Sequence, residues 1–331
     1  MKTNCLLHGR NGDRRAARCA LVVLALWAPL GMAFDLQGHR GARGLAPENT
    51  LAAFERALEI GVSTLELDIA ITADGIPVIS HEPALFEAIT RDAQGQWLKQ
   101  RGPLIKSLTL AQVQAFDVGR SNPESPYGKQ FPDQAPRDGQ RIPTLASLFK
   151  LVNEYGATGV HFNIETKIFP GKPDDTVSPE VFVNTLLATI REAGMTRRVT
   201  LQSFDWRTLQ IVQKLEPGLR TVYLSTQGRN NTLADGSWTA GMLLSQYPSV
   251  AHMVKASGGA VWSPNFNDIT SDAVKGAQAL GLLVIPWTVN NPAEMERLID
   301  WGVDGIISDY PDRLREVMRR RGMALPKGLK N

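Results

Sequence analysis

The sequence contains very little cysteine. Its 331 residues include two cysteines, Cys5 and Cys19, and both lie within the first 33 residues. That segment has the composition of an export signal, and once it is removed the chain has no thiol. The absence of thiols excludes disulfides, cysteine nucleophiles and thiolate metal ligands from the expected mature chain. Cys19 follows Arg18 rather than a small residue, so we do not expect a lipid anchor at this position.

The N-terminal segment also lacks an apolar run long enough to span a bilayer. The run from Cys19 to Leu30 is short and is interrupted by Pro29. It follows a basic segment, and residues 31–33 (Gly-Met-Ala) are small enough for a signal peptidase to read. We therefore expect residues 1–33 to be a signal peptide that is cleaved near Ala33. The mature protein would then be periplasmic or secreted without a membrane anchor, and both the Sec and the twin-arginine routes stay open.

An excess of positive charge is also missing from the expected mature chain. The full sequence has 36 Lys and Arg against 33 Asp and Glu, and residues 1–33 hold five of the basic and one of the acidic side chains. The remaining 31 basic and 32 acidic side chains give a formal net charge of −1. A nucleic-acid-binding surface needs a concentrated positive field, so we do not expect nucleic acid as a partner.

After residue 33, short β-branched runs alternate with amphipathic segments to the end of the chain. The strand-like runs are marked by Asp35, Leu65, Phe162, Thr200, Val222, Val261, Val284 and Ile306. Each run precedes a segment with helical spacing, and strands buried on both faces have this composition. Eight such units predict an α/β fold, the (β/α)8 TIM barrel. A doubly wound open sheet is the alternative, but the chain lacks a glycine-rich dinucleotide fingerprint.

The alternation weakens between about residues 84 and 142. A helix is predicted over residues 108–116, and residues 121–139 are rich in Pro, Gly, Asp and Gln. Insertions of this length in a compact domain are usually functional or form a small subdomain. We expect an insertion after the second strand, near the substrate entrance, within one barrel domain spanning residues 34–325.

Carboxylates occur at alternate positions on two of the predicted strands. Glu66 and Asp68 lie on one strand, and Glu165 and Lys167 repeat this spacing on another. Side chains two residues apart on a strand share a face, and barrel active sites lie at the carboxyl ends of the strands. Three carboxylates from two strands form the hard oxygen site that Ca²⁺ or Mg²⁺ prefers. We expect one divalent ion there, and the expected export to a calcium-accessible compartment favours Ca²⁺.

Two histidines flank these carboxylates in the sequence. His39 follows the first strand in a Gly-His-Arg-Gly turn, and His81 ends a short apolar run. Imidazoles titrate near neutral pH, so the pair could act as general acid and general base. Arg40 and Lys167 add the positive charge that suits a phosphate becoming more negative during attack. These residues together indicate phosphodiester cleavage.

Other polar and aromatic residues have less distinctive positions. Gln202 and Trp287 lie at strand ends and are candidates for substrate contact, although Trp287 could simply be a packed aromatic side chain. We expect His161 and His252 to be structural, because a lone histidine usually is. Taken alone, Glu66 and Asp68 would fit a structural role as salt-bridged residues at the end of a core strand. Histidines, acids and bases recur at matching strand ends, however, and this recurrence favours an active site.

The order of several motifs resembles the glycerophosphodiester phosphodiesterase family. The motifs are H-R-G-A-R-G-L-A-P-E-N-T-L-A-A-F from His39, E-L-D at residues 66–68, D-G-I-P-V-I-S-H ending at His81, then N-I-E-T-K, Q-S-F, P-W-T-V-N and G-I-I-S-D-Y-P. The resemblance covers about residues 37–311. It implies a barrel with an insertion after the second strand. For the site it implies a divalent metal on Glu66, Asp68 and Glu165, catalysis by His39 and His81, and phosphate contacts from Arg40 and Lys167.

The resemblance also implies a reaction. A small-molecule glycerophosphodiester would be hydrolysed, with the metal ion, to an alcohol and sn-glycerol 3-phosphate. Family precedent adds attack by the neighbouring glycerol hydroxyl, through a cyclic phosphate. Two other functions stay open: a phospholipase D-like cyclising lyase acting on lysophospholipids, and a glycerophosphodiester-binding protein without turnover. Which histidine is the acid and which alcohol is released are also open.

Overall fold

The computed structural model describes residues 33–228 and 230–329. The expected signal peptide therefore lies outside the described residues, except for Ala33. Among the helices of the described segments, none is long and apolar enough to cross a membrane.

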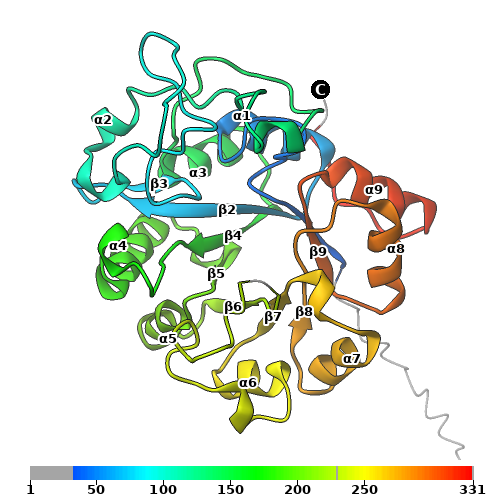
Figure 1. Ribbon diagram of the computed structural model, residues 1–331. Helices are drawn as coiled ribbons and strands as arrows, with labels where there is room; N and C mark the ends of the chain where they lie inside the picture. The colour runs from blue at the N-terminus through cyan, green and yellow to red at the C-terminus, as the bar shows by residue number, and fades with distance from the viewer. Residues whose placement is uncertain (1–32, 229, 330–331) are drawn as a thin grey trace, which may run out of the picture. The chain divides into compact units, whose positions relative to one another are not determined.

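Parallel strands form a barrel in the described part of the chain (Figure 1). The eight strands are β1 (Asp35–Gly38), β2 (Thr64–Ile71), β4 (His161–Thr166), β5 (Val199–Ser203), β6 (Arg220–Ser225), β7 (Val261–Pro264), β8 (Leu283–Val284) and β9 (Gly305–Ser308). Their order is β8-β7-β6-β5-β4-β2-β1-β9. Backbone hydrogen bonds also join the two ends of this order, from Asp304 to Val284 (2.9 Å) and from Ile307 to Pro286 (3.0 Å). The barrel prediction is confirmed, and the open-sheet alternative is wrong.

A helix follows each barrel strand and packs on the outside. These helices are α1 (Leu51–Ile60), α3 (Leu145–Glu154), α4 (Pro179–Glu192), α5 (Trp206–Leu215), α6 (Val250–Ala256), α7 (Ser271–Ala279), α8 (Pro292–Asp300) and α9 (Pro311–Arg320). Several begin at a Thr or Ser whose side-chain oxygen accepts a backbone N–H of the first turn, as at Thr50, Thr144 and Ser178. Their apolar faces bury side chains such as Phe54 and Phe182 against the strands. This packing holds the strands, and with them the polar residues at the strand ends, in position.

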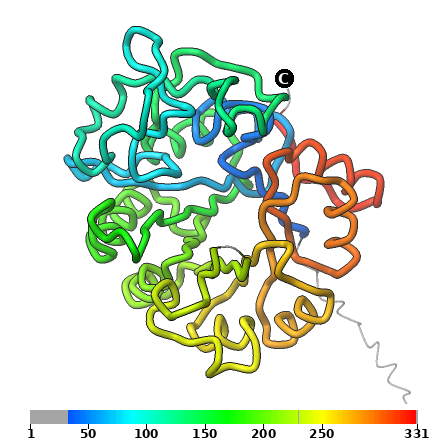
Figure 2. Tube along the Cα trace, in the orientation of Figure 1, coloured from blue at the N-terminus to red at the C-terminus, as the bar shows by residue number. Residues whose placement is uncertain are grey.

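The insertion leaves the barrel after β2 and builds a small core of its own. Strand β3 (Pro77–Ile79) pairs antiparallel with the end of β2. Figure 2 shows the cyan trace that follows, gathered beside β2. Buried apolar residues of the insertion, of β3 and of the end of β2 form a cluster separate from the barrel core: Ala70, Val78, Leu85, Ile105, Val113, Val118 and Ile142. The insertion is thus a packed subdomain.

The helix predicted over residues 108–116 is shorter than expected. Helix α2 covers only Leu110–Val113, and its N-cap residue Thr109 forms a capping box with Gln112. Within this helix only Val113 is fully buried. Gln114 ends the helix, and its side-chain amide donates to the carbonyl of Ile142 (3.2 Å). Tertiary packing therefore overrides the longer helical pattern of the sequence.

Candidate active site

The turn after β1 places two of the predicted residues. His39 follows the last residue of β1, and Arg40 adopts a left-handed backbone conformation with φ 49°, which is costly for a residue other than glycine. Gly41, with φ 84°, lies so close to α1 that an added Cβ would be 2.6 Å from the carbonyl carbon of Ala53. This strained turn directs the Arg40 backbone N–H to Glu66 Oε2 at 2.8 Å.

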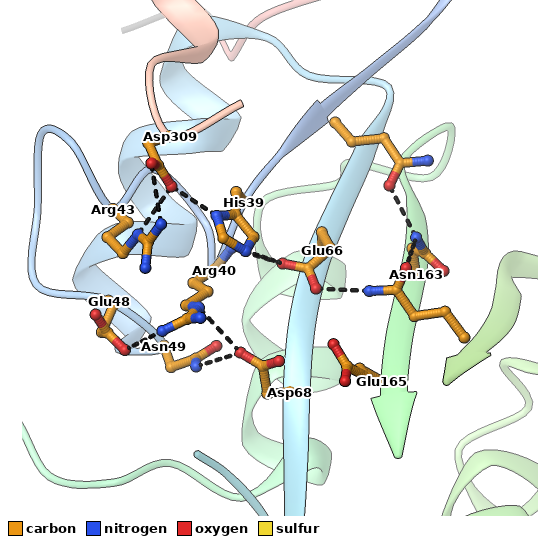
Figure 3. A network of polar contacts seen from close by, with 12 residues as sticks. His39, Arg40, Arg43, Glu48, Asn49, Glu66, Asp68, Asn163, Glu165 and Asp309 are labelled. Carbon is orange, nitrogen blue, oxygen red and sulfur yellow. Dashed lines mark hydrogen bonds and ion pairs between the residues drawn. The ribbon is translucent and has the colours of Figure 1, made fainter. Parts of the chain in front are cut away.

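Three carboxylates converge beside this turn. Glu66 and Asp68 lie on β2, and Glu165 lies opposite Asp68 in the parallel pairing of β2 with β4. One oxygen from each carboxylate lies within 4.8 Å of the others, and all three residues are at most 6% exposed. Figure 3 shows them side by side. The alternate-position spacing of the sequence therefore correctly predicted convergence on one face.

The ionisation of these carboxylates differs with their surroundings. Burial raises the pKa of Glu165 to about 7, and burial together with the charge of Asp68 raises the pKa of Glu66. Burial opposes ionisation of Asp68 too, but the positive charges of Arg40 and Lys167 hold its pKa below the usual range. Three acids held this close repel one another when ionised, and a divalent cation would relieve the repulsion.

Two buried cations contact the carboxylates. Arg40 Nε lies 3.3 Å from Asp68 Oδ2, and Arg40 Nη1 donates to Glu48 Oε1 at 2.7 Å. Lys167 Nζ lies 2.9 Å from Glu165 Oε1 and 3.7 Å from Asp68 Oδ1. Asp68 Oδ1 is buried and accepts no hydrogen bond from the described residues. A buried oxygen without a donor is costly, and hard carboxylate oxygens are the ligands of Ca²⁺ and Mg²⁺. The cluster is therefore compatible with a divalent ion.

His39 is held by a carboxylate from the last barrel strand. Its Nδ1 lies 2.6 Å from Asp309 Oδ1. Asp309 also accepts two hydrogen bonds from the guanidinium of Arg43 (2.8 and 3.0 Å) and one from the side-chain amide of Asn290 (2.7 Å). Because an ionised carboxylate only accepts, Nδ1 of His39 carries the proton. In the neutral imidazole, Nε2 is then the free base, 3.8 Å from Glu66 Oε2.

Both histidines have a lowered pKa, but they lie in different parts of the site. Burial and the charge of Arg43 lower the pKa of His39 to about 4, although Asp309 opposes this effect. Burial and the charges of Arg40 and Lys167 lower the pKa of His81 to about 4. His81 follows β3, and its Nδ1 lies 2.7 Å from Glu82 Oε1. Each imidazole therefore has one nitrogen engaged by a carboxylate and the other left for chemistry.

These groups line a cavity of about 180 Å³, the catalytic pocket. All the predicted site residues line it except Asp68, which is buried in contact with Arg40 and Lys167. The predicted residues that line the pocket are His39, Arg40, Glu66, His81, Glu165, Lys167, Gln202 and Trp287. The remaining wall is largely apolar and includes Phe204, Leu224 and Ile307. The pocket thus has a charged side and an apolar side, which suits a phosphate ester with a short carbon backbone.

Gln202 and Trp287 line the pocket with their polar atoms already engaged. Gln202 donates to Glu66 Oε1 at 2.7 Å and accepts from Asn163 at 2.8 Å, so it holds a carboxylate of the cluster in place. Trp287 Nε1 donates to the carbonyl of Ser263 at 2.9 Å, and its ring meets Phe204 edge to face at 5.3 Å. Trp287 therefore offers only its ring to a ligand.

Several contacts of the site were not predicted from the sequence. The contact of His39 with Asp309 is one of them, although the closure of a barrel sets its last strand beside its first and so brings the two residues together. Tyr127 reaches from the insertion to donate to Glu48, and no sequence pattern signals this contact. His161 and His252, expected to be structural, are exposed and do not line the pocket.

The fold and the pocket together define a (β/α)8-barrel enzyme with buried carboxylates, cations and imidazoles at the carboxyl ends of its strands. Comparison with known proteins gives the family. Residues 39–313 match the model of the glycerophosphoryl diester phosphodiesterase family. The chain belongs to this family.

Individual relatives agree with this assignment. A glycerophosphodiester phosphodiesterase of Caldanaerobacter subterraneus subsp. tengcongensis is 30% identical over 86% of this chain and 97% of its own length. A crystal structure from Silicibacter pomeroyi DSS-3, of a protein proposed to be a glycerophosphoryl diester phosphodiesterase, is 38% identical with a TM-score of 0.80, covering 88% of this chain and 95% of that one. An Oleispira antarctica phosphodiesterase, solved with the product sn-glycerol-3-phosphate, shares the fold at 23% identity, with a TM-score of 0.62 over 86% and 96% of the two chains.

Proposed function

We propose that this protein hydrolyses glycerophosphodiesters to an alcohol and sn-glycerol 3-phosphate, using one divalent ion held by Glu66, Asp68 and Glu165. The observation that carries the proposal is the convergence of these carboxylates, within 4.8 Å, in one pocket with His39 and His81. The activity named for the Caldanaerobacter relative and the product bound to the Oleispira relative support it. When bound, the ion supplies Lewis-acid stabilisation of the phosphate charge, and the proposed export favours Ca²⁺.

The chain's own cations hold the phosphate. Arg40 and Lys167 line the catalytic pocket and are at most 7% exposed, so their attraction for a phosphate oxygen is little screened. Gln202 holds Glu66, which keeps one carboxylate of the cluster in position. The glycerol carbons of the substrate pack against the apolar wall that includes Phe204 and Trp287.

His39 acts as the general base. Its Nε2 is the unprotonated nitrogen, and Asp309 stabilises the imidazolium that forms. The glycerol hydroxyl next to the phosphate gives its proton to Nε2, and its oxygen forms a new bond to phosphorus. We assign the base to His39 because this residue lines the catalytic pocket and not the second cavity, whereas His81 lines both.

His81 acts as the general acid. A bound phosphodiester brings a negative charge beside it, which favours its protonated form. As the bond from phosphorus to the leaving oxygen breaks, His81 gives its proton to that oxygen, and the alcohol departs. In the second step His81 takes a proton from water, and the water oxygen forms a bond to phosphorus. The bond between phosphorus and the glycerol oxygen that attacked first then breaks, His39 gives its proton to that oxygen, and sn-glycerol 3-phosphate is released.

The test measures release of sn-glycerol 3-phosphate from glycerophosphocholine. His39→Ala and His81→Ala should each lower kcat by about a hundredfold or more, the usual contribution of general acid-base catalysis. His161→Ala is the matched control, because His161 is exposed and outside the pocket. Full activity in either pocket variant would contradict the mechanism. Faster turnover of a lysophospholipid to a cyclic phosphate would instead support the lyase alternative.

We also propose that the protein acts outside the cytoplasm after cleavage near Ala33. N-terminal sequencing of the protein recovered from the periplasm or medium tests this proposal. A sequence beginning at Phe34 or close to it supports export with cleavage, and a protein that keeps Met1 and stays in the cell contradicts it.

A further inference from the structure

A second cavity of about 200 Å³ lies between the barrel and the insertion. We call it the insertion cavity. Arg40, Arg43 and His81 line both this cavity and the catalytic pocket. The two cavities therefore meet at the residues that we propose hold the phosphate and protonate the leaving oxygen. A group attached to that oxygen and pointing away from the glycerol would enter the insertion cavity.

The far wall of the insertion cavity is mainly apolar. It is formed by Leu85, Phe86, Ile89, Val118, Tyr127 and Ile142, all from the insertion. Phe86 and Tyr127 meet edge to face with ring centres 5.1 Å apart. Such a wall favours alkyl surface, since apolar groups gain by leaving water.

The charged groups of the cavity already have partners. Arg40 is paired with Glu48, and Arg43 with Asp309. The hydroxyl of Tyr127 donates to Glu48, and the carboxylate of Glu82 contacts His81. Two buried polar atoms of the lining residues, Asn49 Oδ1 and Arg40 Nε, have no hydrogen-bond partner among the described residues. The lining therefore offers few free hydrogen-bonding atoms beside its apolar wall, and a ligand with several hydroxyls would leave some of them unpaired.

We propose that the insertion cavity receives the leaving alcohol and selects compact alcohols with alkyl surface over polyhydroxy alcohols of similar size. This inference rests on the proposed phosphodiesterase function and assigns the alcohol specificity to the insertion. The glycerol 3-phosphate half of the substrate then stays in the catalytic pocket, and the two halves separate on either side of His81.

Ile89 offers a position at which to change the cavity without touching the catalytic groups. It is half-buried and lines the insertion cavity but not the catalytic pocket. Ile89→Phe fills part of the cavity, and Ile89→Ala enlarges it. Ile211→Phe is the matched control, because Ile211 is also half-buried but lies on α5, outside both cavities.

The experiment compares kcat/KM for the methyl, butyl and glyceryl diesters of sn-glycerol 3-phosphate. The unmodified protein should prefer the butyl over the glyceryl ester by about tenfold or more, because an apolar wall leaves an added hydroxyl without a hydrogen-bond partner. Ile89→Phe should lower kcat/KM for the butyl ester about tenfold and leave the methyl ester within about twofold, because methanol needs no cavity. Ile89→Ala should favour a longer alkyl ester, such as hexyl, and Ile211→Phe should change no ratio.

The outcomes separate this inference from the function on which it rests. Equal effects of Ile89→Phe on the methyl and butyl esters, or preference of the unmodified protein for the glyceryl ester, overturn the inference and leave the phosphodiesterase function intact. An unchanged preference of Ile89→Ala among the alkyl esters, measured as kcat/KM, also counts against the inference. Because alanine is smaller than isoleucine, a steric clash cannot explain that result. Failure of the unmodified protein to cleave any ester overturns the proposed function and the inference together.

Discussion

Among single residues, Asp309 makes the most specific contact of the site. It accepts the Nδ1 proton of His39 at 2.6 Å and is itself fixed by Arg43 and Asn290. Burial opposes its ionisation, but the nearby Arg43 and His39 hold its pKa below the usual range. It therefore stays an acceptor at neutral pH, and it contacts His39 without itself lining the catalytic pocket.

Asp309→Asn tests this positioning role. The amide can present its N–H to Nδ1, which places the imidazole proton on Nε2 and removes the free base. We expect kcat to fall by about a hundredfold or more, with KM and thermal stability changed little. Asp300→Asn, at an exposed acid paired with Arg321, is the control. An unchanged kcat, or an equal loss of stability and activity, would show that Asp309 is only structural.

At the level of elements, one aromatic side chain joins the insertion to the barrel site. Tyr127 donates to Glu48 and accepts from Arg43 and Arg40 at 3.3 and 3.5 Å. Glu48 in turn accepts from Arg40 at 2.7 Å. The insertion thereby helps to hold a cation that we propose binds phosphate, so its packing bears on substrate affinity.

Tyr127→Phe should weaken substrate binding more than it slows chemistry. Loss of the hydroxyl leaves one oxygen of buried Glu48 without this donor and loosens Arg40. We expect KM for glycerophosphocholine to rise about threefold to tenfold, with kcat within about twofold. Tyr155→Phe, at a tyrosine that is 45% exposed on the outside of the barrel, is the control. A fall in kcat without a change in KM would count against a binding role.

For the whole molecule, metal binding should be linked to pH. Burial raises the pKa of Glu165 from 4.5 to about 7, so the folded metal-free protein keeps a proton that the unfolded chain loses. The stability from this group is present at low pH and is lost as the pH rises through 7. A divalent ion binds the ionised carboxylate and must displace that proton at lower pH.

The increase in Tm caused by saturating Ca²⁺ should therefore be larger at about pH 8 than at about pH 6, by a few degrees. Samples with and without the ion are compared at the same pH, so titration of the unfolded chain cancels. Glu165→Gln should remove most of this pH dependence. An ion-induced rise in Tm that is the same at both pH values would contradict the linkage.

The sequence predicted the barrel and most of the site for identifiable reasons. A strand pattern followed by a helix pattern recurs eight times in the sequence. The spacing of two residues along a strand brings Glu66, Asp68 and Glu165 to one face. The contact of His39 with Asp309 depends on closure between the first and last strands, 270 residues apart. The contact of Tyr127 with Glu48 depends on the packing of an irregular insertion. Local sequence patterns predict which residues lie at the strand ends. The contacts between residues far apart in the sequence become visible only in the assembled barrel.

The most direct test of the account follows glycerophosphocholine by ³¹P NMR with protein stripped of metal. We predict that the stripped protein turns over at least about a hundredfold more slowly and that added Ca²⁺ or Mg²⁺ restores conversion to sn-glycerol 3-phosphate. Glu66→Gln with Asp68→Asn should prevent the restoration. Full conversion by the stripped protein in the presence of a chelator, or no sn-glycerol 3-phosphate with any divalent ion, would contradict the account.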